Sequence, residues 1–155
     1  MKREKFLMAL TGMHHEALLV CQNIETACAI IRGDGMGHAL EDLTEKVGYF
    51  FNKRLKPHLK AEEKITKALG PHSNAKKEDI QRLFTEHGRL KALLREGSLE
   101  SLETFSKELK AHVQFEEWEL FPLLEKNLTA EEKQAAALEL EKTLAPSLPL
   151  KAKKW

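Results

Sequence analysis

The sequence predicts an all-α protein, an antiparallel up-down-up-down four-helix bundle with a short extra helix at its C-terminal end. Apolar residues recur every three or four positions through four long segments, as they do on the buried face of a helix. The connections between these segments are short and contain glycine or proline. The alternating pattern of a β-strand does not occur in the sequence. Long helices joined by short connections pack as antiparallel neighbours, which gives the bundle.

The four long helices are expected at residues 1–31, 38–69, 75–96 and 99–126. The glycine-rich run from Gly33 to Gly37 should end the first helix, and Gly70 with Pro71 should end the second. Gly97 should end the third, directly before the fourth begins. Each boundary thus coincides with residues that favour a turn.

Two prolines, Pro57 and Pro122, fall inside the second and fourth predicted helices, where the missing N–H should bend the axis. The apolar stripes continue past both, so we expect each helix to continue. Thr129 and Glu132 form a capping box that opens the short extra helix. We expect residues 1–145 to form one domain and residues 146–155 to form a flexible tail.

The composition limits the classes of partner. With a formal net charge of +1 at pH 7, the chain has no strong field that would recruit nucleic acid or a membrane surface. No apolar run approaches the roughly 18 residues that span a bilayer. Cys21 and Cys28 would lie about 10 Å apart along one helix, which is too far for a disulfide. We therefore expect small core cysteines and a cytoplasmic protein.

Six polar side chains occupy positions on the apolar stripes that should face the core. Each long helix supplies one histidine, and the second and fourth helices each add a glutamate four residues later, in two copies of H-x-x-x-E-E. The six residues are His14, His58, Glu62, His87, His112 and Glu116. Left without a partner in a core, each would cost on the order of 2 kcal/mol. A bound metal is the expected partner.

The number and spacing of these residues favour a pair of metal ions. Residues four apart on a helix point the same way, so the histidine and glutamate of each copy can reach the same ion or two adjacent ions. Four imidazoles and two carboxylates are too many for one tetrahedral zinc ion. They suit two ions bridged by carboxylates, usually iron and less often manganese or zinc. Because the chain has no Glu-x-x-His, a ferritin-type di-iron bundle is not expected.

Several assignments stay open in the sequence. His14 keeps the stripe of its helix, whereas His15, about 100° further round, is the alternative ligand. Glu63 and Glu117 each follow an expected ligand and should face solvent, with a hydrogen bond to a histidine N–H as the alternative. Glu63 or Glu86 is also a candidate to complete the coordination.

The segments that carry these residues resemble the hemerythrin-like family, also called the HHE cation-binding domain. The matching segments are residues 10–14, 58–63, 86–90 and 112–122, and the resemblance extends over residues 7–124. The string EEWELFP at the end of the last segment is especially similar to the second acidic motif of the family. A pair of such motifs in this order is far more specific than one H-x-x-x-E.

The resemblance implies a non-haem di-iron centre. By resemblance, the bridges would be Glu62 and Glu116, the ligands of one iron His14 and His58, and those of the other iron His87 and His112. Oxygen-carrying members have a further histidine one turn after the first on the third helix, where this chain has Lys91, and Leu83 stands one turn before. Both irons would keep a position for another ligand, which favours sensing, iron handling or peroxide chemistry over stable O₂ transport.

The sequence therefore predicts a protein that binds two non-haem irons, with manganese or zinc as substitutes, and O₂ or a related small ligand, as a sensor, store or scavenger. The first alternative is a di-iron peroxidase, oxidase or ferroxidase. The second is a structural or interaction bundle without metal. Partners from nucleic acid or membrane are not expected, and both a monomer and a homodimer fit the sequence.

Overall fold

The computed structural model describes residues 3–34, 37–67 and 77–144. Every regular element within these ranges is helical, which confirms the predicted all-α class. The α-helices are α1 (Met8–Asp34), α2 (Gly37–Phe50), α3 (Lys56–Lys67), α4 (Lys77–Glu96), α5 (Leu99–Phe115), α6 (Phe121–Asn127) and α7 (Ala130–Leu144). The shorter elements are a 3-10 turn, η1 (Lys5–Leu7), and the π-helical turns η2 (Phe51–Leu55) and η3 (Glu116–Leu120).

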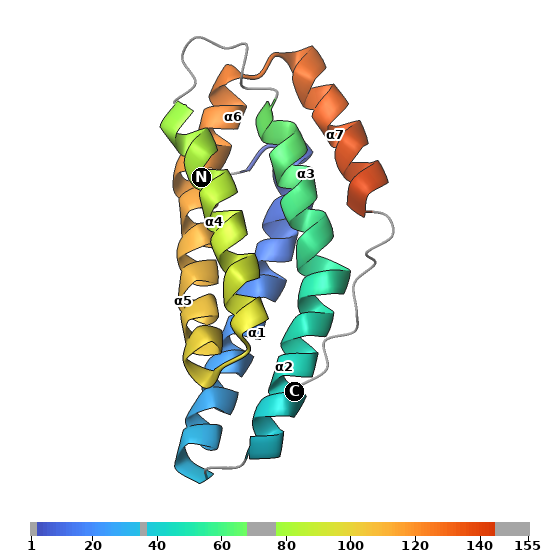
Figure 1. Ribbon diagram of the computed structural model, residues 1–155. Helices are drawn as coiled ribbons and strands as arrows, with labels where there is room; N and C mark the ends of the chain where they lie inside the picture. Colours follow the sequence, from blue (N-terminus) through green and yellow to red (C-terminus); the bar gives the residue numbers. More distant parts are fainter. Residues whose placement is uncertain (1–2, 35–36, 68–76, 145–155) are drawn as a thin grey trace.

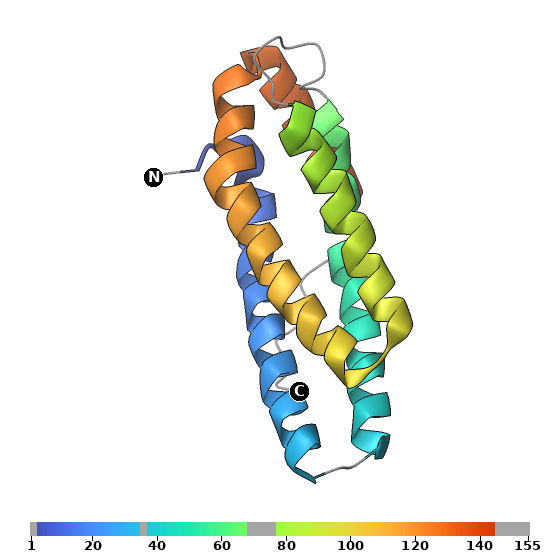
Figure 2. The same cartoon turned by 60° about the vertical axis from the view of Figure 1, so that its left-hand side comes forward.

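The longer helical segments lie side by side along one axis (Figure 1, Figure 2). α2, η2 and α3 form one uninterrupted segment, and α5, η3 and α6 form another. α1 packs against α5 and α2, α4 packs against α5, and α7 lies beside α3 and η1. Within the described ranges, no helix combines the length and the hydropathy that crossing a bilayer requires.

The first predicted helix is wrong at both ends. The described chain enters α1 through η1, so the α-helix begins at Met8, and it continues through Gly33 to Asp34. A glycine in an exposed last turn costs a helix only about 1 kcal/mol relative to alanine, which is too little to end it. The expected boundary at Gly70 and the expected tail, residues 146–155, lie outside the described residues.

Both predicted bends are accommodated by π-helical turns. A proline has no N–H to donate, and its ring crowds the carbonyl four residues earlier. Directly before Pro57, the N–H of Lys56 donates to the carbonyl oxygen of Phe51, five residues earlier. The turn thus contains one extra residue and the helix continues beyond it.

The same arrangement precedes Pro122, and it changes which residues face the core. The N–H of Phe121 donates to the carbonyl oxygen of Glu116 across η3. The extra residue rotates the rest of the helix by one position. Leu124 is therefore buried, whereas Leu123, which follows the buried Leu120 by three residues and would face the core on a regular helix, is only partly buried.

Apolar side chains form a core cluster on each side of the six polar residues. The first cluster draws on α1, α2, η2, α3, α4 and α5 and contains Phe105 with Cys21 and Cys28, whose thiols are free and buried as predicted. The second draws on η1, α1, α3, α4, α5, η3, α6 and α7. The histidines lie between neighbours from the two clusters: Leu10 and Ala17 around His14, Leu55 and Ala61 around His58, Leu83 and Leu90 around His87, and Leu109 and Phe115 around His112.

A capping box fixes the start of α5 and gives a first testable prediction. The Ser98 hydroxyl accepts the Ser101 N–H at 3.0 Å, and the Ser101 hydroxyl accepts the Ser98 N–H at 3.0 Å. We expect Ser98→Ala to lower the free energy of unfolding by about 1 kcal/mol, because an N–H at the helix terminus loses its acceptor. Urea denaturation measures the change. Ser98→Asp keeps an acceptor and serves as the control, so equal losses in both variants would contradict the explanation.

The predicted capping box of the extra helix is confirmed. Glu132 accepts the N–H of Thr129 at 2.9 Å, and the Thr129 hydroxyl accepts the N–H of Glu132 at 3.1 Å. These bonds start α7 at the end of the segment that contains α6, so α7 can fold back against α3.

Candidate metal centre

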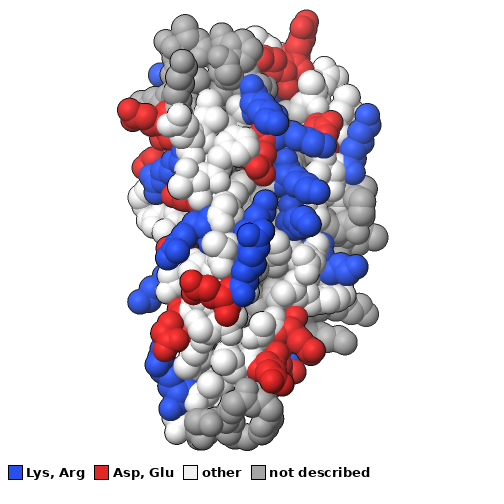
Figure 3. All heavy atoms as spheres, in the orientation of Figure 1, with Lys and Arg blue, Asp and Glu red and all other residues white. Residues whose placement is uncertain are grey.

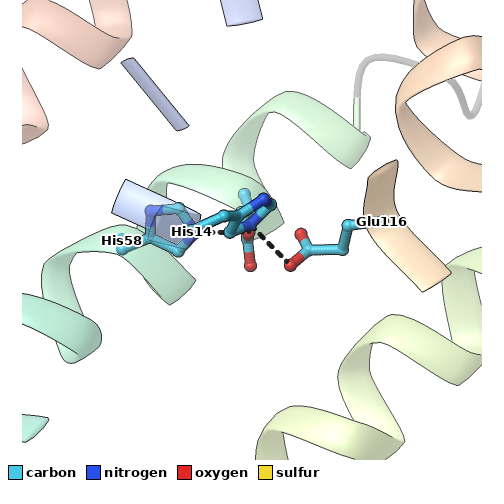
Figure 4. Close-up of side chains that lie close together, drawn as sticks. His14, His58 and Glu116 are labelled. Carbon is cyan, nitrogen blue, oxygen red and sulfur yellow. Dashed lines mark ion pairs between the residues drawn. The ribbon is translucent and has the colours of Figure 1, made fainter. Parts of the chain in front are cut away.

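The structure brings together the six polar side chains that the sequence places on the core stripes. They are His14 on α1, His58 and Glu62 on α3, His87 on α4, His112 on α5 and Glu116 at the start of η3. None is more than 4% exposed. Figure 4 shows the rings of His14 and His58 and the carboxylate of Glu116 lying close together.

One group of four residues contains His14, His58, Glu62 and Glu116, with one ligand atom from each within 4.8 Å of all the others. The Nε2 atom of His14 lies 3.3 Å from Oε1 of Glu116 and 3.6 Å from Oε2 of Glu62. The Nε2 atom of His58 lies 2.6 Å from Oε2 of Glu62. Two imidazole nitrogens and two carboxylates from three segments of the chain therefore meet in one place.

A second group contains Glu62, His87 and His112. The Nε2 atoms of the two histidines are 3.1 Å apart, and Nε2 of His87 lies 3.0 Å from Oε1 of Glu62. Glu62 thus offers one oxygen to each group. Glu116 also faces both, because its Oε1 lies 3.0 Å from Nε2 of His112 as well as 3.3 Å from Nε2 of His14. Both carboxylates lie between the two pairs of imidazoles.

Contacts within the cluster leave many of its polar atoms without a hydrogen bond. Among the described residues, both carboxylate oxygens of Glu116 and both ring nitrogens of His58 have no hydrogen-bond partner. Nε2 of His58 and Oε2 of Glu62 are close, but they do not meet at hydrogen-bond angles. A buried polar atom left in this state costs about 1–3 kcal/mol. A self-contained core network does not account for such an arrangement.

The electrostatics of the cluster favour bound cations. Burial opposes charge on His14, but the surrounding carboxylates, led by Glu116, outweigh it and raise its pKa to about 11. Burial also opposes charge on His112, whose pKa is nevertheless well above the ordinary value. Burial acts to raise the pKa of Glu62, but His58 and its other neighbours hold it well below the usual range. The Glu62 carboxylate thus stays anionic at neutral pH, and metal ions would replace the protons of His14 and His112.

The outer nitrogen of His14 contacts a further carboxylate. Nδ1 of His14 lies 2.6 Å from Oε2 of Glu117, and the Thr11 hydroxyl donates to the same oxygen at 2.9 Å. Arg3 lies 3.3 Å from the other oxygen of Glu117. A carboxylate on the second ring nitrogen fixes the orientation of an imidazole, as is common for histidines that ligate metals.

The π-helical turn η3 contributes to this contact. Because the N–H of Phe121 donates to Glu116, the carbonyl of Glu117 loses its usual helical partner. Arg3 donates to that carbonyl at 2.7 Å and to Oε1 of Glu125 at 2.6 Å. The chain segment before α1 is thereby fastened next to the carboxylate that orients His14.

The outer nitrogens of His112 and His87 differ in how closely a carboxylate approaches them. Nδ1 of His112 lies 2.8 Å from Oε1 of Glu86, whose other oxygen accepts a hydrogen bond from Arg82 at 2.7 Å. Nδ1 of His87 lies 3.5 Å from Oε2 of Glu63, which is longer than a good hydrogen bond. Glu63 and Glu86 therefore contact the outer side of the histidine cluster.

The structure shows where the residues of the open assignments lie, and it corrects one expectation. His14 is buried in the cluster, whereas His15 is exposed. The two positions one turn from His87 on α4 supply no imidazole. Lys91 is partly buried, and Leu83 belongs to an apolar core cluster. The expectation that Glu117 faces solvent is wrong: its side chain is only 21% exposed because it packs against α1 and Arg3.

These groups could hold metal ions. Imidazole nitrogens and carboxylate oxygens suit iron, manganese and zinc alike, so the donor set does not choose among them. Comparison with known proteins gives no relative: no family model, no curated protein and no solved structure matches the chain. The geometry of these side chains is therefore what indicates a function.

Proposed function

We propose that this chain is a hemerythrin-like bundle that holds two non-haem iron ions and binds O₂ or a related small ligand. One observation carries the proposal: four imidazole Nε2 atoms, from α1, α3, α4 and α5, converge on two fully buried carboxylates. A structural histidine in a core needs one hydrogen-bond partner and gains nothing from other histidines beside it. Two bridged cations would satisfy all six side chains at once.

The proposed ligand arrangement follows the two groups. Glu62 and Glu116 would bridge the ions, His14 and His58 would bind one ion, and His87 and His112 would bind the other. The position of both carboxylates between the imidazole pairs supports this division. Successive long segments run in opposite directions in Figure 1, which supports an antiparallel up-down-up-down bundle. Manganese or zinc would fit the same donors.

The residues around the ligands support binding of a small molecule at the ions. Glu63 and Glu86 contact the outer nitrogens of His87 and His112, so they do not fill positions on the inner side. Lys91 stands where a further imidazole would be needed for the ligand set of an oxygen carrier. Each ion would keep a position for water or a small ligand, and the apolar clusters on both sides would exclude bulk water.

The chain itself would orient the ligands and hold their charge. Glu117 and Glu86 would keep the imidazoles of His14 and His112 turned inward through their Nδ1 atoms. The iron pair, when bound, supplies electrons and a Lewis-acidic site for the small ligand. The carboxylates of Glu62 and Glu116 would balance the charge of the ions in a site closed to solvent.

Metal analysis with an absorption spectrum tests the proposal. Protein purified without added metal is loaded with ferrous iron under argon, desalted and exposed to air. We expect about two irons per chain and new near-ultraviolet and visible absorption on exposure. Less than one iron per chain, together with no new absorption, would contradict the proposal and favour a bundle without metal.

The open positions also favour a second candidate, a di-iron peroxidase, oxidase or ferroxidase. Steady turnover of ferrous iron or peroxide, measured with substrate in large excess, distinguishes it from a binding protein. A single stoichiometric oxidation without turnover would leave the binding protein as the function.

A further inference from the structure

The outer face of α2, η2 and α3 carries a line of lysines. Exposed lysines occur at steps of three or four residues, so they share one side of this segment: Lys53, Lys56, Lys60, Lys64 and Lys67. We call this set the lysine face. Figure 3 shows Lys and Arg side chains gathered along the middle of the surface that α3 and α4 form. The stretch 51–67 has six Lys or Arg and two Glu, although the whole chain has a net charge of only +1.

Most of these lysines have no partner within the described part of the chain. Lys64 forms an ion pair with Glu139 on α7 at 2.8 Å. For Lys53, Lys56, Lys60 and Lys67, no carboxylate of the described residues lies within ion-pair distance. Like charges at this spacing repel one another and weaken a helix. The lysine face therefore costs local stability, which a partner of opposite charge would recover.

The lysine face lies on the opposite side of α3 from the histidine cluster. His58 and Glu62 point inward from α3. Lys60 lies on the outer surface of α3, one turn before Glu63. Glu63 is 24% exposed, and its carboxylate lies 3.5 Å from Nδ1 of His87. A single side chain thus separates the surface beside the lysines from an imidazole of the cluster.

The chemistry of the face favours a protein as the partner. Tyr49, which is 53% exposed, lies four residues before Lys53 and extends the line on α2. An exposed tyrosine beside charges is typical of a protein interface. A membrane-binding helix needs a row of apolar residues, and single-stranded nucleic acid needs several stacking aromatics. Arg54, the arginine of this segment, is not part of the lysine face, because it is buried and pairs with Glu16.

We propose that the lysine face is the docking surface of an acidic electron-transfer protein. Docking itself needs only the lysines, whereas the electron step rests on the function proposed above. In each encounter the reduced centre of the partner loses one electron, and one ferric ion of the pair becomes ferrous. Two encounters would reduce both ions, and Glu63, whose carboxylate lies 3.5 Å from Nδ1 of His87, stands between the surface and the cluster.

Binding to an acidic plant-type ferredoxin tests the docking step on the metal-free full chain. The lysine-face variant combines Lys53→Gln, Lys56→Gln, Lys60→Gln and Lys67→Gln. The control variant combines Lys5→Gln, Lys107→Gln, Lys126→Gln and Lys142→Gln, which removes the same charge from exposed positions elsewhere. We expect about tenfold weaker binding for the lysine-face variant, less than about twofold for the control, and weaker binding of the wild type at high salt.

Other results would overturn the proposal. Equal weakening in both variants would mean that net charge alone matters. Absence of ferredoxin binding, or lysine-dependent binding to phosphatidylserine vesicles or to a single-stranded oligonucleotide instead, would exclude the acidic protein. Stopped-flow reduction of the iron-loaded protein by ferredoxin should show the same variant dependence, whereas reduction by dithionite should not. Because docking is measured without metal, failure to load iron does not affect that result.

Discussion

Replacing Glu62 with glutamine should prevent the proposed pair of metal ions from binding while the helices stay folded. Glutamine keeps the volume of the side chain, so the packing of α3 is preserved. It removes the negative charge that faces both groups, including the oxygen 3.0 Å from His87 and the oxygen 2.6 Å from His58. An amide cannot bridge two cations as a carboxylate does. We expect the iron content to fall from about two per chain to at most one.

The neighbouring glutamate provides a matched control. Glu63→Gln is the same chemical change one residue later, on a side chain whose carboxylate lies 3.5 Å from the outer nitrogen of His87. Loss of such an outer contact weakens metal binding by about 10–100-fold without removing a ligand. Both variants are loaded with excess ferrous iron and analysed by metal content and circular dichroism. Two irons in Glu62→Gln, or equal losses in both folded variants, would show that Glu62 is not a bridge.

Residue spacing predicts which segments are helical and that their histidines face inward. A histidine at a place where the stripe requires an apolar residue, as at His58 or His112, indicates both burial and a partner. This inference works because the helical period fixes direction within one segment. It also predicts that residues from separate helices meet, since all of the stripes must face the same core.

Contacts around the outer nitrogens of the histidines could not be predicted in this way. Glu117 follows Glu116 and should point about 100° away from the core on an ideal helix. It contacts His14 because α1 packs directly against α5, and that packing joins residues more than a hundred positions apart. In the sequence, only the polar Thr11, one turn before His14, indicated a polar contact on this side of α1. Nothing in the sequence indicated the contact of Arg3, because it depends on the tertiary position of its segment.

The π-helical turns show a second limit of sequence reasoning. Pro57 and Pro122 indicate that the regular helix is interrupted. A kink, a break and an extra residue would each relieve the clash between the proline ring and the preceding turn. The choice depends on what the freed groups can contact. At Pro122 the freed carbonyl of Glu117 accepts a hydrogen bond from Arg3, so the extra residue becomes compatible with a packed helix.

Metal loading should raise the midpoint of thermal unfolding by roughly 10 °C. Ions that bind only the folded chain stabilise it by about 4 kcal/mol at a thousandfold excess over the dissociation constant. For a chain of this size, each kcal/mol shifts the midpoint by about 2–4 °C. The six proposed ligands come from segments that the chain connects only through loops or long helices, and they separate two apolar clusters. Ions bound between the two clusters would therefore link both halves of the core.

The two adjacent histidines of α1 make this prediction specific. His14→Ala removes a side chain that is 4% exposed and should abolish most of the metal-dependent shift. His15→Ala removes an exposed side chain of the same kind and should keep the full shift. Calorimetry of both variants with and without metal measures the difference. If the wild type melts at the same temperature in both states, its polar cluster contributes no metal-linked stability, and the His14 network with Glu117 and Thr11 is a purely structural feature of the core.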